Sequence, residues 1–300
     1  MRKNTFLLLS LLLALCLLFT GCASIEELQG RYQALVTGTV TLETAGELNA
    51  FLDKYLKRFD DHTADHMVME YELYLTNYCS ANPDKVKVEG VAAYFDQATH
   101  SFHEEKLQKS EFKDFLQELE EANLKLVWYE GALRVKVNYD SLLSRFGAEV
   151  SEPVRKLFEL QALTVNQPMM QNAVLQISLQ QVLDRAALAE ELLVQYKEEH
   201  LITTDALELY KLYINTLLMG TTNSPVIDYK SGVFSAEAKK VYEDFLLQHP
   251  DTVTGWVLNE YFTYLSGVDY TVNYSNGDES KVFFDTCAWL VSQAEKRVTQ

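Results

Sequence analysis

The sequence is poor in the residues that build cofactor loops and disulfide frameworks. Its 300 residues include only 12 glycines, 5 prolines and 4 cysteines. So few glycines leave little material for loops that cradle phosphates, and no P-loop, dinucleotide-binding turn, G-x-S-x-G elbow or cysteine–histidine nucleophile pattern is present. These absences exclude enzymes built on those motifs, and they leave other enzymes open.

Positive charge is also scarce. The chain has 43 Asp and Glu against 26 Lys and Arg, a formal net charge of −17. Residues 1–21 contain Arg2, Lys3 and no acid, so the remainder carries −17 − 2 = −19. Nucleic acid and anionic lipid headgroups repel a domain this acidic, which excludes nucleic acid as a partner.

Long apolar runs are missing except near the N-terminus. Arg2 and Lys3 precede an apolar run over residues 6–19, and the sequence Phe19-Thr20-Gly21-Cys22 comes at its end. A run of this length suits the core of a secretory signal peptide and is short of the roughly 20 residues that span a bilayer. The small residues before Cys22 do not form an A-x-A cleavage site.

The tetrapeptide resembles the lipobox of bacterial lipoproteins, in which an aliphatic residue, a small residue and Gly or Ala precede a Cys. Phe19 departs from the usual Leu, and the resemblance covers only the first two dozen residues. It implies a signal peptide over 1–21, cleavage between Gly21 and Cys22, and acylation of Cys22 by fatty chains such as palmitate. The alternatives are a simple secretory peptide and an uncleaved anchor.

Such a modification would determine where the protein resides. One acyl chain binds a membrane only marginally, whereas two hold a protein stably, at ~0.8 kcal/mol per buried methylene. We therefore expect residues 22–300 to form a lipid-anchored domain on the extracytoplasmic face of the cell membrane.

Apolar residues at spacings of three and four predict helices through most of this domain. Thr44, Ser110, Ser178 and Thr204 are predicted N-caps, and Gly220 is a predicted C-cap. The expected helices are 25–35, 44–59, 64–79, 91–101, 110–122, 152–163, 179–199, 204–219, 235–248, 252–265 and 279–298. The predicted fold class is mainly α, with antiparallel helical hairpins arranged as a solenoid or a bundle.

Residues 124–139 interrupt the helical pattern. Leu133, Val135 and Val137 alternate with polar residues, and Glu130-Gly131 lies midway. This pattern predicts one short β-hairpin inserted near the middle of the chain. Because two strands are rarely stable alone, it should pack on helices or pair with a third strand, for which 268–274 is a candidate.

Two helix pairs, 187–218 and 236–265, resemble the helix–turn–helix units of tetratricopeptide-type solenoids. The resemblance covers about a quarter of the chain, and the family's small residues do not recur at a constant period. It implies stacked helical hairpins.

His62 and His66 are the best metal-ligand candidates. Their spacing places both imidazoles on one helix face, as in zinc-metalloprotease helices. In those helices a Glu follows the first His, but Thr63 stands there in this chain, so the protease motif is incomplete.

A second pair, His100 and His103, is followed by Glu104 and Glu105 and could share an ion with the first pair. Acid pairs such as Asp60-Asp61 and Glu120-Glu121 lie in runs on polar helix faces, where solvation is the simplest interpretation. We interpret the histidines as solvated residues near helix ends, and we predict no metal and no other cofactor.

Residues 22–300 contain two cysteines besides Cys22. Cys79 and Cys287 both lie in apolar, helical surroundings, so we predict two buried free thiols rather than the disulfide that export would permit. Tyrosines at helical spacing, such as Tyr71, Tyr74 and Tyr78, fit a core stripe better than the lining of a ligand surface.

These observations predict a membrane-tethered binding module at the cell envelope, with a protein, a peptide or an envelope component as its partner. One alternative is a hydrolase of envelope polymers with dispersed catalytic residues, and another is a structural or assembly lipoprotein. Two acids converging in a cleft would favour the hydrolase, a concave groove lined by tyrosines would favour binding, and a large exposed apolar patch would favour assembly.

Overall fold

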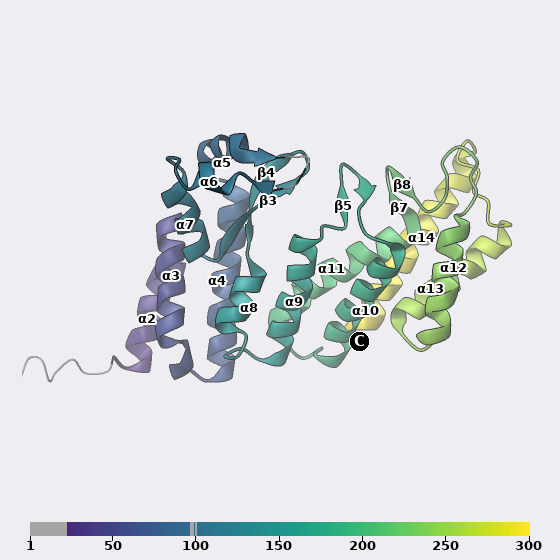
Figure 1. Ribbon diagram of the computed structural model, residues 1–300. Helices are drawn as coiled ribbons and strands as arrows, with labels where there is room; N and C mark the ends of the chain where they lie inside the picture. Colours follow the sequence, from purple (N-terminus) through teal and green to yellow (C-terminus); the bar gives the residue numbers. More distant parts are fainter. Residues whose placement is uncertain (1–22, 97–98, 100) are drawn as a thin grey trace, which may run out of the picture.

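The protein is mainly α-helical. The computed structural model describes residues 23–96, 99 and 101–300, so the predictions for residues 1–22 and for His100 lie outside the described residues. The chain is 67% helical, which confirms the predicted fold class of helical hairpins with a β-hairpin insertion. Figure 1 shows the helices arranged in a row from α2 at the left to α12 and α13 at the right, with short hairpins along the upper edge.

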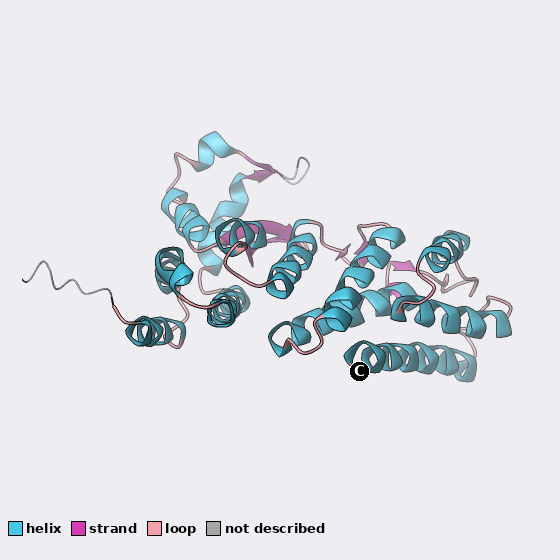
Figure 2. Ribbon diagram, turned by 90° about the horizontal axis from the view of Figure 1, so that it is seen from below, coloured by secondary structure: helices cyan, strands magenta, loops and turns pink. Residues whose placement is uncertain are grey.

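Helices and short connections alternate along the described part of the chain. Figure 2 shows several helices of the N-terminal half end-on, as near-parallel axes require. None of these described helices combines the length and the apolar character that crossing a bilayer demands. The helices are α2 (Ile25–Val36), α3 (Leu42–Tyr55), η1 (Leu56–Arg58), α4 (Asp61–Ala81), α5 (Lys85–Val91), η2 (Ala92–Tyr94), α6 (Glu104–Leu107), α7 (Lys113–Glu121), α8 (Tyr139–Phe146), α9 (Glu152–Asn166), α10 (Leu179–Gln195), α11 (His200–Met219), α12 (Ala236–Gln248), α13 (Val253–Gly267) and α14 (Gly277–Thr299).

Two predicted caps are confirmed. The Ser178 side chain accepts from the Gln181 amide, and the Gln181 side chain accepts from the Ser178 amide, which completes a capping box at α10. Gly220 ends α11 with a φ of +73°, and a Cβ there would lie 2.3 Å from the Ser224 carbonyl oxygen. Only glycine fits that position without a backbone shift.

Two other predicted caps are wrong. Helix α3 begins at Leu42, and the Thr41 hydroxyl, rather than Thr44, caps it by accepting from the Thr44 amide. Helix α7 begins at Lys113, and the Ser110 hydroxyl accepts from the Phe112 amide in the turn before the helix. Both serine and threonine hydroxyls readily make such local turns, so the sequence pattern alone does not locate the helix start.

The predicted N-cap Thr204 is also wrong. Helix α11 begins four residues earlier, at His200, with Glu199 at its N-cap and no side-chain cap bond. Thr204 and Asp205 therefore lie inside α11, where they face the space between helices.

The predicted helix over 91–101 is wrong. After η2 the chain forms two short strands, β1 (Phe95–Asp96) and β2 (Ser101–Phe102), which pair antiparallel. The Phe95 ring stacks on Trp128 with ring centroids 5.2 Å apart and contacts Phe102 at 4.9 Å. These aromatic contacts with a distant strand outweigh the local helical pattern.

The predicted β-hairpin is confirmed. Strand β3 (Leu124–Tyr129) pairs antiparallel with β4 (Ala132–Val137), and Glu130 and Gly131 form the turn with φ of 50° and 76°. Two positive φ values are typical of a type I′ turn. The hairpin packs on α4 and α7, which supplies the support that two strands need.

The predicted third strand does not join this hairpin. Within 268–274, Thr271 forms an isolated bridge with Val233 in the C-terminal half. Two further short hairpins occur among the described residues, β5 (Met170–Gln171) with β6 (Val174–Leu175) and β7 (Gly220–Thr221) with β8 (Ser224–Pro225).

Buried tyrosines join neighbouring helices through their hydroxyls. Tyr71 donates to the Ala122 carbonyl at 2.8 Å, and Tyr261 donates to the Leu218 carbonyl at 2.7 Å. Each of these side chains fills core volume and satisfies a carbonyl at a helix end, where intrahelical partners are missing. The tyrosine stripes are therefore core, as predicted.

A buried carboxylate fixes the start of α13. Glu190 of α10 is 7% exposed and accepts from the Val253 amide at 2.6 Å, the Thr254 amide at 2.8 Å and the Thr254 hydroxyl at 2.7 Å. A negative charge at a helix N-terminus also interacts favourably with the helix dipole.

We expect Glu190→Gln to destabilise the protein by about 2 kcal/mol, because an amide cannot accept all three bonds and leaves a buried donor unpaired. Denaturant unfolding monitored by circular dichroism measures this loss. The exposed Glu243→Gln serves as the matched control and should change stability by less than about 0.5 kcal/mol. Equal stabilities of the two variants would contradict the role of Glu190.

Candidate functional site

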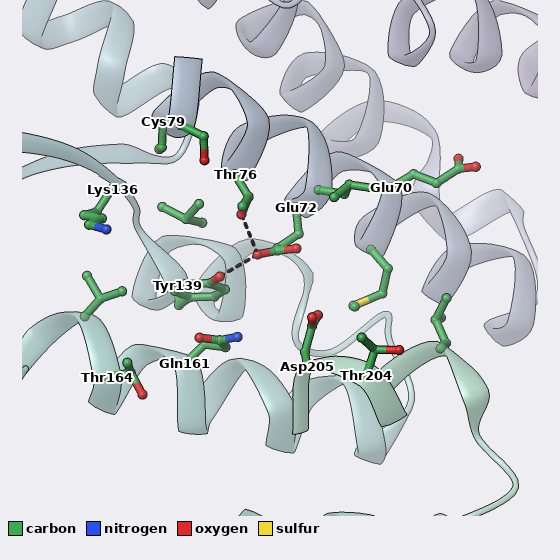
Figure 3. Close-up of a pocket in the computed structure, with 16 residues that line it drawn as sticks. Glu70, Glu72, Thr76, Cys79, Lys136, Tyr139, Gln161, Thr164, Thr204 and Asp205 are labelled. Atoms are coloured by element: carbon green, nitrogen blue, oxygen red, sulfur yellow. Dashed lines mark hydrogen bonds between the residues drawn. The ribbon is translucent and has the colours of Figure 1, made fainter. Parts of the chain in front are cut away.

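A pocket of about 590 Å³ lies between α4, the end of β4, α9 and α11. Its size falls within the range of roughly 300–1,000 Å³ that is typical of small-ligand pockets. Figure 3 shows the side chains that line it.

The helical repeat explains how α4 supplies one wall. Met69, Glu72, Thr76 and Cys79 are spaced by three and four residues, so they share one face of α4. The last turn of α9 and the first turns of α11 form the facing wall, and Lys136 and Tyr139 enter from β4 and the start of α8.

Glu72 is a buried acid in the pocket wall. It is 7% exposed, and its Oε1 accepts from the Tyr139 hydroxyl at 2.5 Å and from the Thr76 hydroxyl at 3.0 Å (Figure 3). Burial raises the pKa of Glu72, the two hydrogen bonds lower it, and the charge of Asp205 raises it, with a net rise.

Asp205 is the second acid of the pocket. Its carboxyl is directed toward that of Glu72 in Figure 3, and burial raises its pKa. Among the described residues, no hydrogen bond or ion pair to the Asp205 side chain is found. Two acids therefore face each other in a partly buried pocket, with no compensating cation from the described residues. Such an arrangement lowers the stability of the folded protein. It is common at functional sites.

Lys136 lies at the other end of the pocket (Figure 3). Its ammonium lies 5.2 Å from the centroid of the Tyr129 ring. None of the salt bridges within the described part of the chain involves it. The pocket is thus acidic at one end and basic at the other.

Both cysteines of the described chain are free, as predicted. Cys287 is buried, whereas Cys79 is only half-buried and lines the pocket. Burial raises the pKa of each thiol to about 12, so neither is a thiolate nucleophile at neutral pH.

The histidine candidates do not join this pocket. His62 and His66 lie exposed at the start of α4 with ring centroids 4.6 Å apart. Among the described residues, no three His, Cys, Asp or Glu side chains gather in a group that could hold a metal ion. These two imidazoles therefore have no third ligand from the described chain.

The remaining candidate residues lie on the surface. His103, Glu104 and Glu105 are exposed, and so are the pairs Asp60-Asp61 and Glu120-Glu121. Asp60 has a structural role, since its carboxylate caps α4 by accepting from the Thr63 amide at 2.9 Å, and this bond lowers its pKa.

The sequence analysis missed both acids of the pocket. A usable signal exists for Glu72, because it is a charged residue within the buried stripe of α4 that contains Tyr71 and Leu75. Asp205 carries none, since the pattern assigns it to the first turn of a helix, where an acid is ordinary.

Compared with known proteins, the chain matches no family model, no curated protein and no solved structure. Its function must therefore be inferred from the chemistry of its own pocket.

We expect Asp205→Asn to raise the stability of the ligand-free protein at neutral pH. A carboxyl whose pKa rises on folding destabilises the folded state once the unfolded chain ionises, so the cost is absent below about pH 4 and complete above the folded pKa. The melting temperature of the variant should exceed that of the wild type by a few degrees at pH 7.5 and match it at pH 3.5 or below.

The exposed Asp244→Asn is the matched control and should show little difference at either pH. An Asp205→Asn variant that is less stable than the wild type at pH 7.5 would contradict the absence of a compensating partner.

Proposed function

We propose that this protein is a lipid-anchored binding protein of the cell envelope that takes a small ligand into the pocket between α4 and α11. The observation that carries the proposal is the pair Glu72 and Asp205, two acids held in one cavity with no cation beside them among the described residues. Burying two carboxyls without a cation destabilises the ligand-free protein. A ligand that supplies a positive charge or hydrogen-bond donors would remove this cost, and the difference would contribute to the binding free energy.

The start of the folded chain fits an anchor at Cys22. The Ala23 carbonyl already accepts from the Arg58 guanidinium at 2.8 Å, and α2 begins two residues later behind a capping box at Ser24. A lipid on Cys22 would therefore hold the domain directly against the bilayer. With a net charge of −19 after residue 21, the lipid rather than surface charge would be the tether.

Two acids in one pocket are also the feature expected from the sequence for the alternative, hydrolysis of an envelope polymer, because glycoside hydrolases use a pair of carboxyls. This is the second candidate function. One observation weighs against it. A single cavity of about 590 Å³ suits one small molecule better than an extended polymer.

We expect Cys22→Ala to release the protein from the membrane fraction or to block its processing. Fractionation of cells followed by mass analysis of the N-terminus measures both outcomes. Cys79→Ala is the control for loss of a thiol elsewhere and should remain membrane-bound. Normal processing and membrane retention of Cys22→Ala would overturn the anchor.

We expect Val165→Trp, which places an indole in the pocket, to abolish ligand binding. The probe is the small-molecule fraction of an envelope extract, and the readouts are thermal shift and native mass spectrometry. Val194→Trp is the matched control, because Val194 is exposed on α10 and does not line the pocket. Binding that survives Val165→Trp would place the ligand elsewhere and contradict the proposal.

A further inference from the structure

The acidic end of the pocket has an open acceptor. Both hydrogen bonds of the Glu72 carboxylate go to Oε1, so its Oε2 has no partner within the described residues although the side chain is 7% exposed. The carboxyl points into the pocket (Figure 3). Together with both oxygens of Asp205, it offers three acceptor atoms to a donor in the cavity.

A ligand ammonium matches these acceptors better than a metal ion does. An ammonium carries three N–H donors on one positive charge, so it can serve both carboxyls at once. Metal ions in proteins take four or more ligands, and no group of three metal-binding side chains exists among the described residues.

The opposite end of the pocket favours an anion. The Lys136 ammonium lies at that end (Figure 3) and has no carboxylate partner within the described chain. The lining also includes apolar side chains, with Met69 and Leu73 on α4, Val165 on α9 and Leu201 on α11.

We propose that the pocket binds a zwitterion, namely a short peptide with apolar side chains, its ammonium between Glu72 and Asp205 and its carboxylate toward Lys136. The inference rests on the proposed function and names the ligand class of that pocket. The volume of about 590 Å³ accommodates a di- or tripeptide.

The test uses the dipeptide Leu-Leu in four forms: free, C-amidated, N-acetylated, and blocked at both ends. Isothermal titration with the whole mature domain measures the Kd of each. We expect N-acetylation to weaken binding roughly tenfold or more, because it removes the ammonium, and C-amidation to weaken it by a smaller factor, because Lys136 is less buried. The doubly blocked peptide should bind weakest.

Two variants test which pocket residue binds each end of the peptide. Asp205→Asn should weaken the free and the C-amidated peptide roughly tenfold, with little effect on the N-acetylated one. Lys136→Met should remove the difference between the free and the C-amidated peptide. The exposed Asp244→Asn is the control and should bind all four forms as the wild type does.

Equal affinity for the free and the N-acetylated peptide, or no binding of any form at millimolar concentration, would overturn the zwitterion assignment. The proposed function is tested separately. A compound from the envelope extract that binds the wild type but not Val165→Trp would still support ligand binding in this pocket. The two failures are therefore distinguishable.

Discussion

The burial of α4 is the constraint on which the rest of this structure depends. The helix packs against α3 and the β3–β4 hairpin, and one face of its middle turns is buried. Tyr71 satisfies a carbonyl of a neighbouring segment, and the Tyr32 hydroxyl donates to the Met67 carbonyl on α4 itself. A charged residue on the inner side of this helix therefore faces either core or pocket, and Glu72 is tolerated because Tyr139 and Thr76 donate to it.

The same burial explains why one end of the pocket attracts positive charge. Hydrogen bonds satisfy one oxygen of Glu72 and leave the other free, while Asp205 receives none from the described residues. If these acids were only structural, a glutamine or an asparagine would fit the same space without the cost of desolvating a charge. The presence of two acids is more simply explained by a bound cation than by folding, which is why the pair supports a binding function.

Local signals in the sequence predict most of the long helices and the main hairpin, but they do not predict the site. Ser178, Gly220 and the turn at Glu130-Gly131 mark their elements through short-range chemistry, so the structure follows them. The segment 91–101 departs from its pattern because Phe95 stacks on Trp128, a contact that no local window contains. The pocket is of the same kind: Glu72, Tyr139 and Asp205 are far apart in sequence and meet only through the packing of α4, α8 and α11.

The position of the pocket explains how an acidic cavity persists in a well-packed chain. Helix α9 contacts both α8 and α11, whereas α4 and the first turns of α11 face each other across the cavity. Core interiors are filled to high density, so a pocket of this size lies where facing helices are not packed directly against each other. A ligand in that position would contact α4 on one side and α11 on the other. Binding would therefore stabilise the folded state by linking the two groups of helices. Glu72 on α4 and Asp205 on α11 would both attract the positive end of the ligand.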